Sequence, residues 1–264
     1  MRPLWLAPLV GCAPLEAALE SPYVLTTGLG EVRSIALLPG DALVVAASTG
    51  TVRVDGTGAT TPLGPPADAV TTFPDRLVVV SDGQVRWGPI PAASQPFRAS
   101  AALDVPGARD ALGWYDDTAL VLTRSGLARL RFDGGGLEPL GAAPPGARGL
   151  ALSGTPGAVL VVTGDGVHTW RAGAGFEPLV VADHARAAAV DALGQTWLVH
   201  GEPAQLSRIG ADGTLTAVAH HLGAPVDAHC GGGGLLPATH LYLAGAGGTV
   251  DYLPLPTSRG DRSP

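Results

Sequence analysis

The chain has 264 residues, a formal net charge of −7 at neutral pH, 38 glycines, 24 prolines and two cysteines, and it contains neither lysine nor asparagine. The missing lysine excludes Schiff-base chemistry and a P-loop, and the negative charge argues against nucleic-acid binding, which requires a basic face. Two cysteines cannot form a disulfide framework, and no apolar run reaches the roughly 18 residues that span a bilayer.

The first twenty residues contain the sequence LVGC, Leu9 to Cys12, which resembles a bacterial lipobox. We predict that residues 1–11 are a lipoprotein signal peptide, that residues 12–20 are a spacer, and that Cys12 carries the lipid. The lipid would then be the only membrane attachment, and it would place the protein in the bacterial cell envelope. The preceding stretch PLWLAPLV is short for a signal peptide and contains two prolines, so LVGC as four ordinary residues stays open as an alternative.

Six related segments follow one another along the chain, starting near residues 33, 68, 109, 148, 186 and 226. Each segment contains an Ala- and Val-rich stretch, a turn, an apolar run, a second turn and an alternating stretch. The second turns include STG, SDG, RSG and GDG, and a third turn follows in four segments. Four antiparallel strands with a period of about 40 residues are typical of a β-propeller blade. We therefore predict an all-β fold, a six-bladed β-propeller over residues 21–256, followed by a disordered tail over 257–264.

The sixth segment lacks an outermost strand, because only a polar tail follows TVDYLPLP (249–256). The missing strand is predicted at the other end of the chain, where SPYVLTTGLGEVRS (21–34) aligns with TLTAVAHHLGAPVDA (214–228). We expect residues 23–27 to pair with residues 249–253. This pairing would close the ring and remove an open sheet edge.

The stretches ARLRFDGGGLEPL (128–140) and SRIGADGTLTAVAHHLGAPVDA (207–228) resemble the repeats of gluconolactonase-like and NHL-like propellers. The resemblance implies a six-bladed ring with a ligand site at one mouth of its central channel. Gluconolactonase-like enzymes hold a divalent metal there with Glu, Asn and Asp side chains. Because this chain has no asparagine, that metal site is not carried over, and we predict no cofactor.

Charged residues stand at the start of the predicted innermost strands, at one end of the channel. They are Arg33, Asp68, Arg109, Asp110, Arg148, Arg186 and Asp227. Guanidinium groups bind carboxylates and phosphates through paired hydrogen bonds, so one interpretation is a mouth that binds an anionic or polar group. The other interpretation is an Arg–Asp network that joins neighbouring blades.

Most histidines occur late in the chain, close to the second cysteine: His200, His220, His221, His229 and His240, with Cys230. Their spacing matches no standard zinc motif, and adjacent residues on a strand point to opposite faces. We therefore predict no metal site.

These features favour a non-enzymatic, lipid-anchored propeller that binds a protein or another envelope component through one face, and that is a monomer. No Gly-x-Ser-x-Gly motif marks a nucleophile. The alternative is a divergent lactonase-like or lyase-like enzyme with its site at the channel mouth. In that case Asp110 and Asp227 would act together with the arginines.

Overall fold

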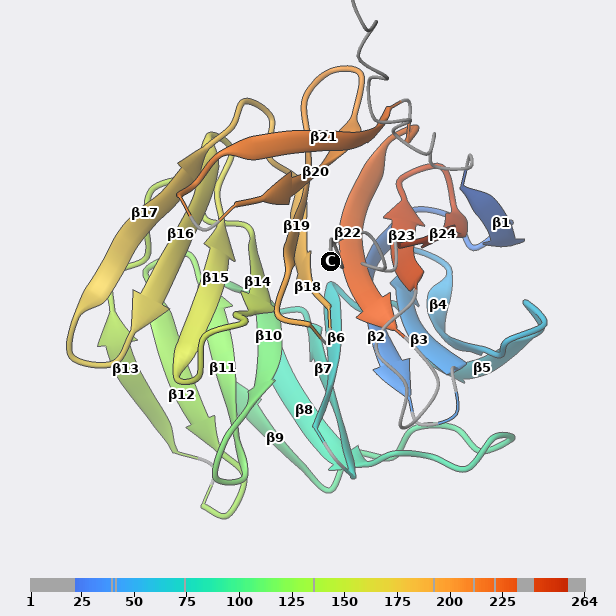
Figure 1. Ribbon diagram of the computed structural model, residues 1–264. Coiled ribbons are helices and arrows are strands. Elements are labelled where there is room, and N and C mark those ends of the chain that lie inside the picture. The colour runs from blue at the N-terminus through green and yellow to red at the C-terminus, as the bar shows by residue number, and fades with distance from the viewer. Residues whose placement is uncertain are drawn as a thin grey trace, which may run out of the picture.

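The computed structural model describes residues 22–255 except 39, 41, 74, 135, 192, 211, 221 and 232–239. In this part of the chain, 24 strands form six four-stranded antiparallel sheets arranged as blades around a channel (Figure 1). None of the described residues forms a helix long and apolar enough to cross a membrane. The predicted signal peptide, the spacer with Cys12 and the tail lie outside the described residues.

The first three blades follow the chain from the innermost to the outermost strand. Blade 1 consists of β2 (Val32–Leu38), β3 (Ala42–Ala47), β4 (Gly50–Val54) and β5 (Thr60–Gly64). Blade 2 consists of β6 (Ala69–Phe73), β7 (Arg76–Ser81), β8 (Gln84–Pro89) and β9 (Ala101–Asp104). Blade 3 consists of β10 (Ala108–Trp114), β11 (Thr118–Thr123), β12 (Leu127–Arg131) and β13 (Leu137–Gly141).

The last three blades complete the ring. Blade 4 consists of β14 (Gly149–Leu152), β15 (Ala158–Val162), β16 (Gly166–Arg171) and β17 (Gly175–Val181). Blade 5 consists of β18 (Ala187–Val190), β19 (Thr196–His200), β20 (Gln205–Ile209) and β21 (Leu215–His220). Blade 6 consists of β22 (Pro225–Gly231), β23 (His240–Gly245), β24 (Thr249–Pro254) and, from the start of the chain, β1 (Tyr23–Thr26).

The second strands of blades 1 to 5 are almost wholly buried on both faces because the neighbouring blades cover them. Strands β3 and β11 are buried at every residue, and their sequences ALVVAA and TALVLT are almost entirely apolar. The cores lie between blades and are shared by them. Between blades 2 and 3, for example, the rings of Trp87 and Phe132 lie 5.7 Å apart. Burial against both neighbours therefore explains why a single blade would not be stable alone.

Strand β1 closes the ring as predicted, and it ends at Thr26, one residue before the predicted end at Thr27. Tyr23 pairs with Tyr252 and Thr26 with Val250, and the two tyrosine rings stack 5.2 Å apart. The innermost strands of blades 6 and 1 also lie in contact, so the ring is continuous. Six blades, four antiparallel strands per blade and closure by an N-terminal strand are all confirmed.

Blade 2 departs from the common plan between its third and fourth strands. The sequence shows no tight turn there, and residues 90–100 instead form a longer connection before β9. In this connection, Phe97 donates its backbone N–H to the carbonyl oxygen of Leu63 at 2.8 Å and packs against the core shared by blades 1 and 2. The proline-rich stretch thus covers a core that a short hairpin would leave open.

Candidate functional site: the channel mouth

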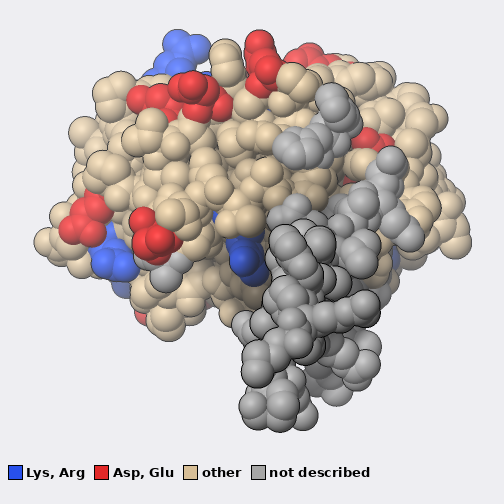
Figure 2. Space-filling view, turned by 45° about the horizontal axis from the view of Figure 1, so that its top comes forward, with Lys and Arg blue, Asp and Glu red and all other residues tan. Residues whose placement is uncertain are grey.

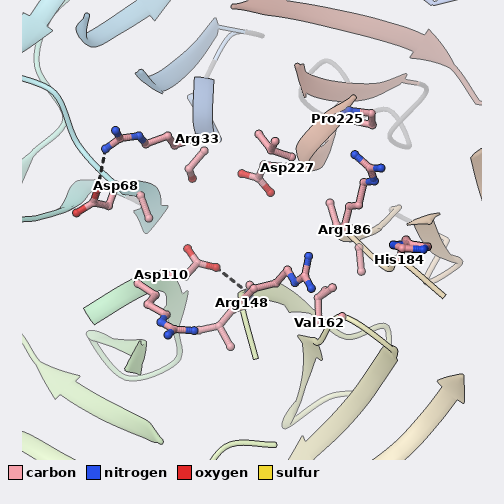
Figure 3. A pocket seen from close by; sticks show the side chains of 18 of the residues that line it. Arg33, Asp68, Asp110, Arg148, Val162, His184, Arg186, Pro225 and Asp227 are labelled. Atoms are coloured by element: carbon pink, nitrogen blue, oxygen red, sulfur yellow. Dashed lines mark hydrogen bonds and ion pairs between the residues drawn. The ribbon is translucent and has the colours of Figure 1, made fainter. Parts of the chain in front are cut away.

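Two consecutive residues at the start of each innermost strand form two rings of side chains around one end of the channel. The outer ring consists of Arg33, Asp68, Arg109, Arg148, Arg186 and Val226. The inner ring consists of Ser34, Ala69, Asp110, Gly149, Ala187 and Asp227. All twelve residues line a single cavity of about 500 Å³. The structure therefore brings all seven residues singled out in the sequence to one channel mouth (Figure 3).

Two arginines of the outer ring are paired with carboxylates. Nη1 of Arg33 donates to Oδ1 of Asp68 at 2.8 Å and so joins blade 1 to blade 2. Nη2 of Arg186 donates to Oε1 of Glu202 at 3.4 Å within blade 5. The same carboxylate oxygen lies 3.7 Å from Nδ1 of His184. For these two arginines the network interpretation applies, although only the first pair links two blades.

The other two arginines, Arg109 and Arg148, have no carboxylate partner among the residues that the structure describes. Nη1 of Arg109 donates to the carbonyl oxygen of Ala147 at 3.1 Å, which places this guanidinium next to the backbone of Arg148. Arg148 packs over Gly164, where an added Cβ would lie 2.5 Å from Nη2. Both arginines are exposed in the mouth, so their charges are available to a ligand.

Two carboxylates of the inner ring point into the channel from blades 3 and 6 (Figure 3). Oδ2 of Asp110 accepts the N–H of Leu150 at 2.7 Å, and Oδ1 accepts the N–H of Ala111 at 2.8 Å. Oδ2 of Asp227 accepts the N–H of Ile35 at 2.9 Å. Each carboxylate therefore bonds to the innermost strand of the next blade, as an internal link of the ring.

All three polar residues of the inner ring bond to the backbone of the next blade. Ser34 of blade 1 bonds through its hydroxyl to the N–H and to the carbonyl of Val70 in blade 2, each at 3.3 Å. The innermost strand is a sheet edge, and its backbone groups face the channel without a strand partner on that side. Polar side chains of the preceding blade supply the missing hydrogen-bond partners. The polar residues of the inner ring therefore have a structural role, because they link neighbouring blades.

Burial and, second to it, the charge of Asp227 across the channel together raise the pKa of Asp110 to about 8. The two backbone N–H groups that Asp110 accepts oppose this shift without cancelling it. Part of the residue borders the channel, yet the strands around the carboxyl group keep bulk water away from it. At neutral pH Asp110 therefore holds its proton for most of the time.

The mouth consequently carries a positive excess at neutral pH. Arg33 and Arg186 are compensated by Asp68 and Glu202, and the Asp110 carboxyl is mostly neutral. Within the mouth cavity, Arg109 and Arg148 then face the negative charge of Asp227, and Arg148 also attracts the carboxylate of Asp165 in the turn beside Gly164. Below the carboxylates, the channel narrows to a cavity of about 60 Å³ lined largely by alanine, valine and leucine side chains. A polar ligand would therefore be held at the mouth.

The residues of the mouth do not fit the divalent metal of gluconolactonase-like propellers. Ca²⁺ takes six to eight oxygen ligands, whereas the inner ring offers two carboxylates and the outer ring beside it carries four guanidinium groups. Within the described ranges, no three His, Cys, Asp or Glu side chains lie close enough together to hold a metal ion.

Two of the late histidines have described side chains, and neither lies in the mouth. Nε2 of His200 lies 2.9 Å from Oγ of the buried Ser207, and burial lowers the pKa of His200. His240 packs its ring edge-on against Tyr252 in blade 6. The remaining late residues have side chains outside the described part: His220, His221, His229 and Cys230.

Sequence reasoning missed three residues of the mouth: His184, Glu202 and Gly164. His184 and Glu202 lie in connections that share no repeat pattern, whereas Gly164 belongs to the recurring second turn GDG, which the sequence identified only as a turn. Nothing in the sequence around His184 indicates that this residue lies at the mouth, because its position depends on how the connection before β18 folds. Glu202 lies in the turn between β19 and β20, at the same end of blade 5 as Arg186.

No family model matches the chain, and no curated protein matches it by sequence. Solved structures resemble it in fold. A gluconolactonase from Xanthomonas campestris has a TM-score of 0.68 and 16% identity, with 90% of this chain and 95% of that chain covered. A protein of unknown function from Bacteroides thetaiotaomicron has a TM-score of 0.70 and 11% identity, with 89% and 75% covered.

A PQQ-bound aldose sugar dehydrogenase from Streptomyces coelicolor has a TM-score of 0.63 and 16% identity, with 89% of this chain and 97% of that chain covered. At such identities the likeness shows a shared fold alone. The resemblance to gluconolactonase-like propellers is confirmed at that level.

The shifted pKa of Asp110 predicts a pH dependence of stability. Between the ordinary value of 3.8 and the folded value of about 8, the unfolded chain loses this proton while the folded chain keeps it. The contribution of Asp110 to the free energy of unfolding therefore falls as pH rises through this window, by at most about 1.4 kcal/mol per pH unit. In urea unfolding at pH 5, 6, 7 and 8, the wild type should lose stability with pH more steeply than Asp110→Asn.

Two further variants serve as controls in the same series. Asp227→Asn removes the like charge, so its pH slope should lie between those of the wild type and Asp110→Asn. Asp133→Asn removes a carboxylate from an exposed turn of blade 3 and should follow the wild type. Parallel curves for the wild type and Asp110→Asn would show that Asp110 does not hold its proton.

Proposed function

We propose that the protein is a non-enzymatic propeller whose channel mouth binds an anionic group of a protein or other envelope component. The observation that carries this proposal is the pair of neighbouring arginines, Arg109 and Arg148, which line the mouth without a carboxylate partner among the described residues. A guanidinium group offers a planar set of donors that matches a carboxylate or a phosphate.

The surroundings of the two arginines support an anionic ligand. Asp110 directly follows Arg109 in the chain. Its carboxyl group is mostly neutral at pH 7, so it repels a bound anion only weakly. Asp68 and Glu202 form ion pairs with Arg33 and Arg186, which leaves Asp227 as the remaining carboxylate of the mouth. On the face seen in Figure 2, the charged groups of the described residues are small and separated by uncharged surface. A localised anion therefore suits the protein better than a nucleic acid, which requires an extended basic face.

We also propose that the protein is a monomer anchored to the bacterial envelope through a lipid on Cys12. The direction of β1 supports this arrangement. Strand β1 runs from Tyr23 toward Thr26, which lies beside the β23–β24 turn at the mouth end of blade 6. The described chain thus enters the propeller at the end remote from the mouth, and an anchor before β1 would leave the mouth facing away from the membrane.

A second candidate is an acid–base enzyme at the same mouth, favoured by the raised pKa of Asp110. A carboxyl group that keeps its proton near neutral pH can act as a general acid, and its partner Asp227 could accept a proton. The gluconolactonase among the structural neighbours makes a lactone the natural test substrate. Hydrolysis of gluconolactone above the spontaneous rate, abolished in Asp110→Asn, would favour this candidate over simple binding.

Anion binding is tested with inorganic phosphate and butyrate as probes, by NMR titration of the full chain. We expect both probes to shift the resonances of the mouth residues. The double variant Arg109→Gln/Arg148→Gln should weaken binding on the order of tenfold or more, because two charge-assisted contacts are lost. The control Arg131→Gln/Arg208→Gln removes the same charge from exposed arginines outside the mouth. Equal affinities of the two double variants would refute the mouth as the anion site.

Lipidation is tested by metabolic labelling of the full chain in a bacterial host with a palmitate analogue. The wild type should incorporate label and fractionate with the membrane, whereas Cys12→Ser should do neither. Cys230→Ser is the matched control and should label like the wild type. If the wild type incorporates no label, the lipid anchor is wrong and LVGC is an ordinary stretch of chain.

A further inference from the structure

A second hollow adjoins the mouth on the side of blades 2 and 3, with a volume of about 900 Å³. It lies between the β7–β8 turn at Asp82, the connection before β10 and the β11–β12 turn at Arg124. Arg33, Asp68 and Arg109 line both this hollow and the mouth cavity. The two spaces therefore form one continuous surface, in which Arg109 is shared.

Arg124 is held in position at the outer end of the hollow. Its backbone N–H donates to the carbonyl oxygen of Gly107 at 3.0 Å. Its aliphatic stem packs on Gly107, where an added Cβ would lie 3.2 Å from Cγ of Arg124. No carboxylate among the residues described pairs with its guanidinium, which is exposed to solvent. Backbone and stem thus fix the base of the side chain while its charge stays available.

The opposite wall of the hollow belongs to blade 2 and is negative. Asp82 has a φ of 51° in the turn, and its N–H donates to Oδ2 of Asp68 at 3.3 Å. Asp68 is neutralised by Arg33, which leaves the carboxylate of Asp82 as the charge of this wall. An anion in the hollow would therefore lie toward blade 3, against Arg124.

We propose that the mouth and the hollow together form one elongated site for a linear ligand with two anionic groups. The first group binds at Arg109 and Arg148, and the second binds at Arg124. Asp82 keeps the second group against blade 3. This inference rests on the proposed function of the mouth and specifies its ligand class as an extended dianion, such as a dicarboxylate. A compact monoanion would occupy the mouth alone.

The experiment compares straight-chain dicarboxylates from succinate to sebacate with monocarboxylates of the same carbon number, by NMR titration of the full chain. Varying the length of the dicarboxylate varies the distance between its two carboxylates, so the series tests which distance matches the separation of Arg124 from Arg109 and Arg148. We expect one range of lengths to bind on the order of fivefold more tightly than the matched monocarboxylate, because a second charge-assisted contact forms within the same complex. Arg124→Gln should abolish this advantage.

Two more variants sharpen the result. Asp82→Asn removes the repulsive charge while keeping a side chain that tolerates positive φ, and it should increase the dicarboxylate advantage. Arg131→Gln removes an exposed arginine from the other end of blade 3 and should leave the advantage unchanged.

The inference is overturned if no dicarboxylate exceeds its monocarboxylate, or if the advantage persists in Arg124→Gln. Monocarboxylate binding that still depends on Arg109 and Arg148 would leave the proposed function of the mouth standing in either case. If neither class of probe shifts the mouth resonances of the wild type, the proposed function and this inference both fail.

Discussion

The structure depends on how the innermost strands satisfy their backbone groups at the channel. Each of these strands is a sheet edge with no strand partner on the channel side, and six such edges enclose the channel. Three side chains supply the missing hydrogen-bond partners. Ser34, Asp110 and Asp227 each accept a backbone N–H from the innermost strand of the next blade. The same contacts that hold neighbouring blades in register thus bring two carboxylates into the channel at opposed positions of the ring.

This structural use of carboxylates determines the electrostatics of the mouth. Burial of the Asp110 carboxyl group, and after it the negative charge of Asp227 on the opposite side of the ring, raise the pKa of Asp110 to about 8, so that Asp110 keeps its proton at neutral pH. The positive charges of Arg109 and Arg148 are then left without full compensation. The proposed anion site therefore requires no additional element of the fold, because Arg109 and Arg148 occupy the outer-ring position, one residue before Asp110 and Gly149 of the inner ring. The chain shares its fold with gluconolactonase-like propellers, while the residues of its mouth do not fit the metal of those enzymes.

The fold could be predicted from the sequence because turn chemistry and apolar runs recur with a fixed period. The closing strand followed from the same repeat, since the sixth copy lacks a partner for β24. The seven charged residues of the mouth could be placed together because they occupy equivalent repeat positions. The protonation of Asp110 could not be predicted, since it depends on burial and on a second carboxylate in blade 6. His184 and Glu202 were missed because the connections that position them share no repeat pattern. The hollow at Arg124 was missed because the recurring turns SDG and RSG line it only once neighbouring blades pack together.

The anion proposed to bind at Arg109 and Arg148 can be located by anomalous diffraction from crystals soaked in bromide and, separately, in selenate. We expect an anomalous peak between the guanidinium groups of these two arginines, and no such peak in crystals of Arg109→Gln/Arg148→Gln. Anion peaks confined to other arginines, with the mouth empty in the wild type, would contradict the proposal. A divalent cation bound between Asp110 and Asp227 in the same crystals would contradict it as well.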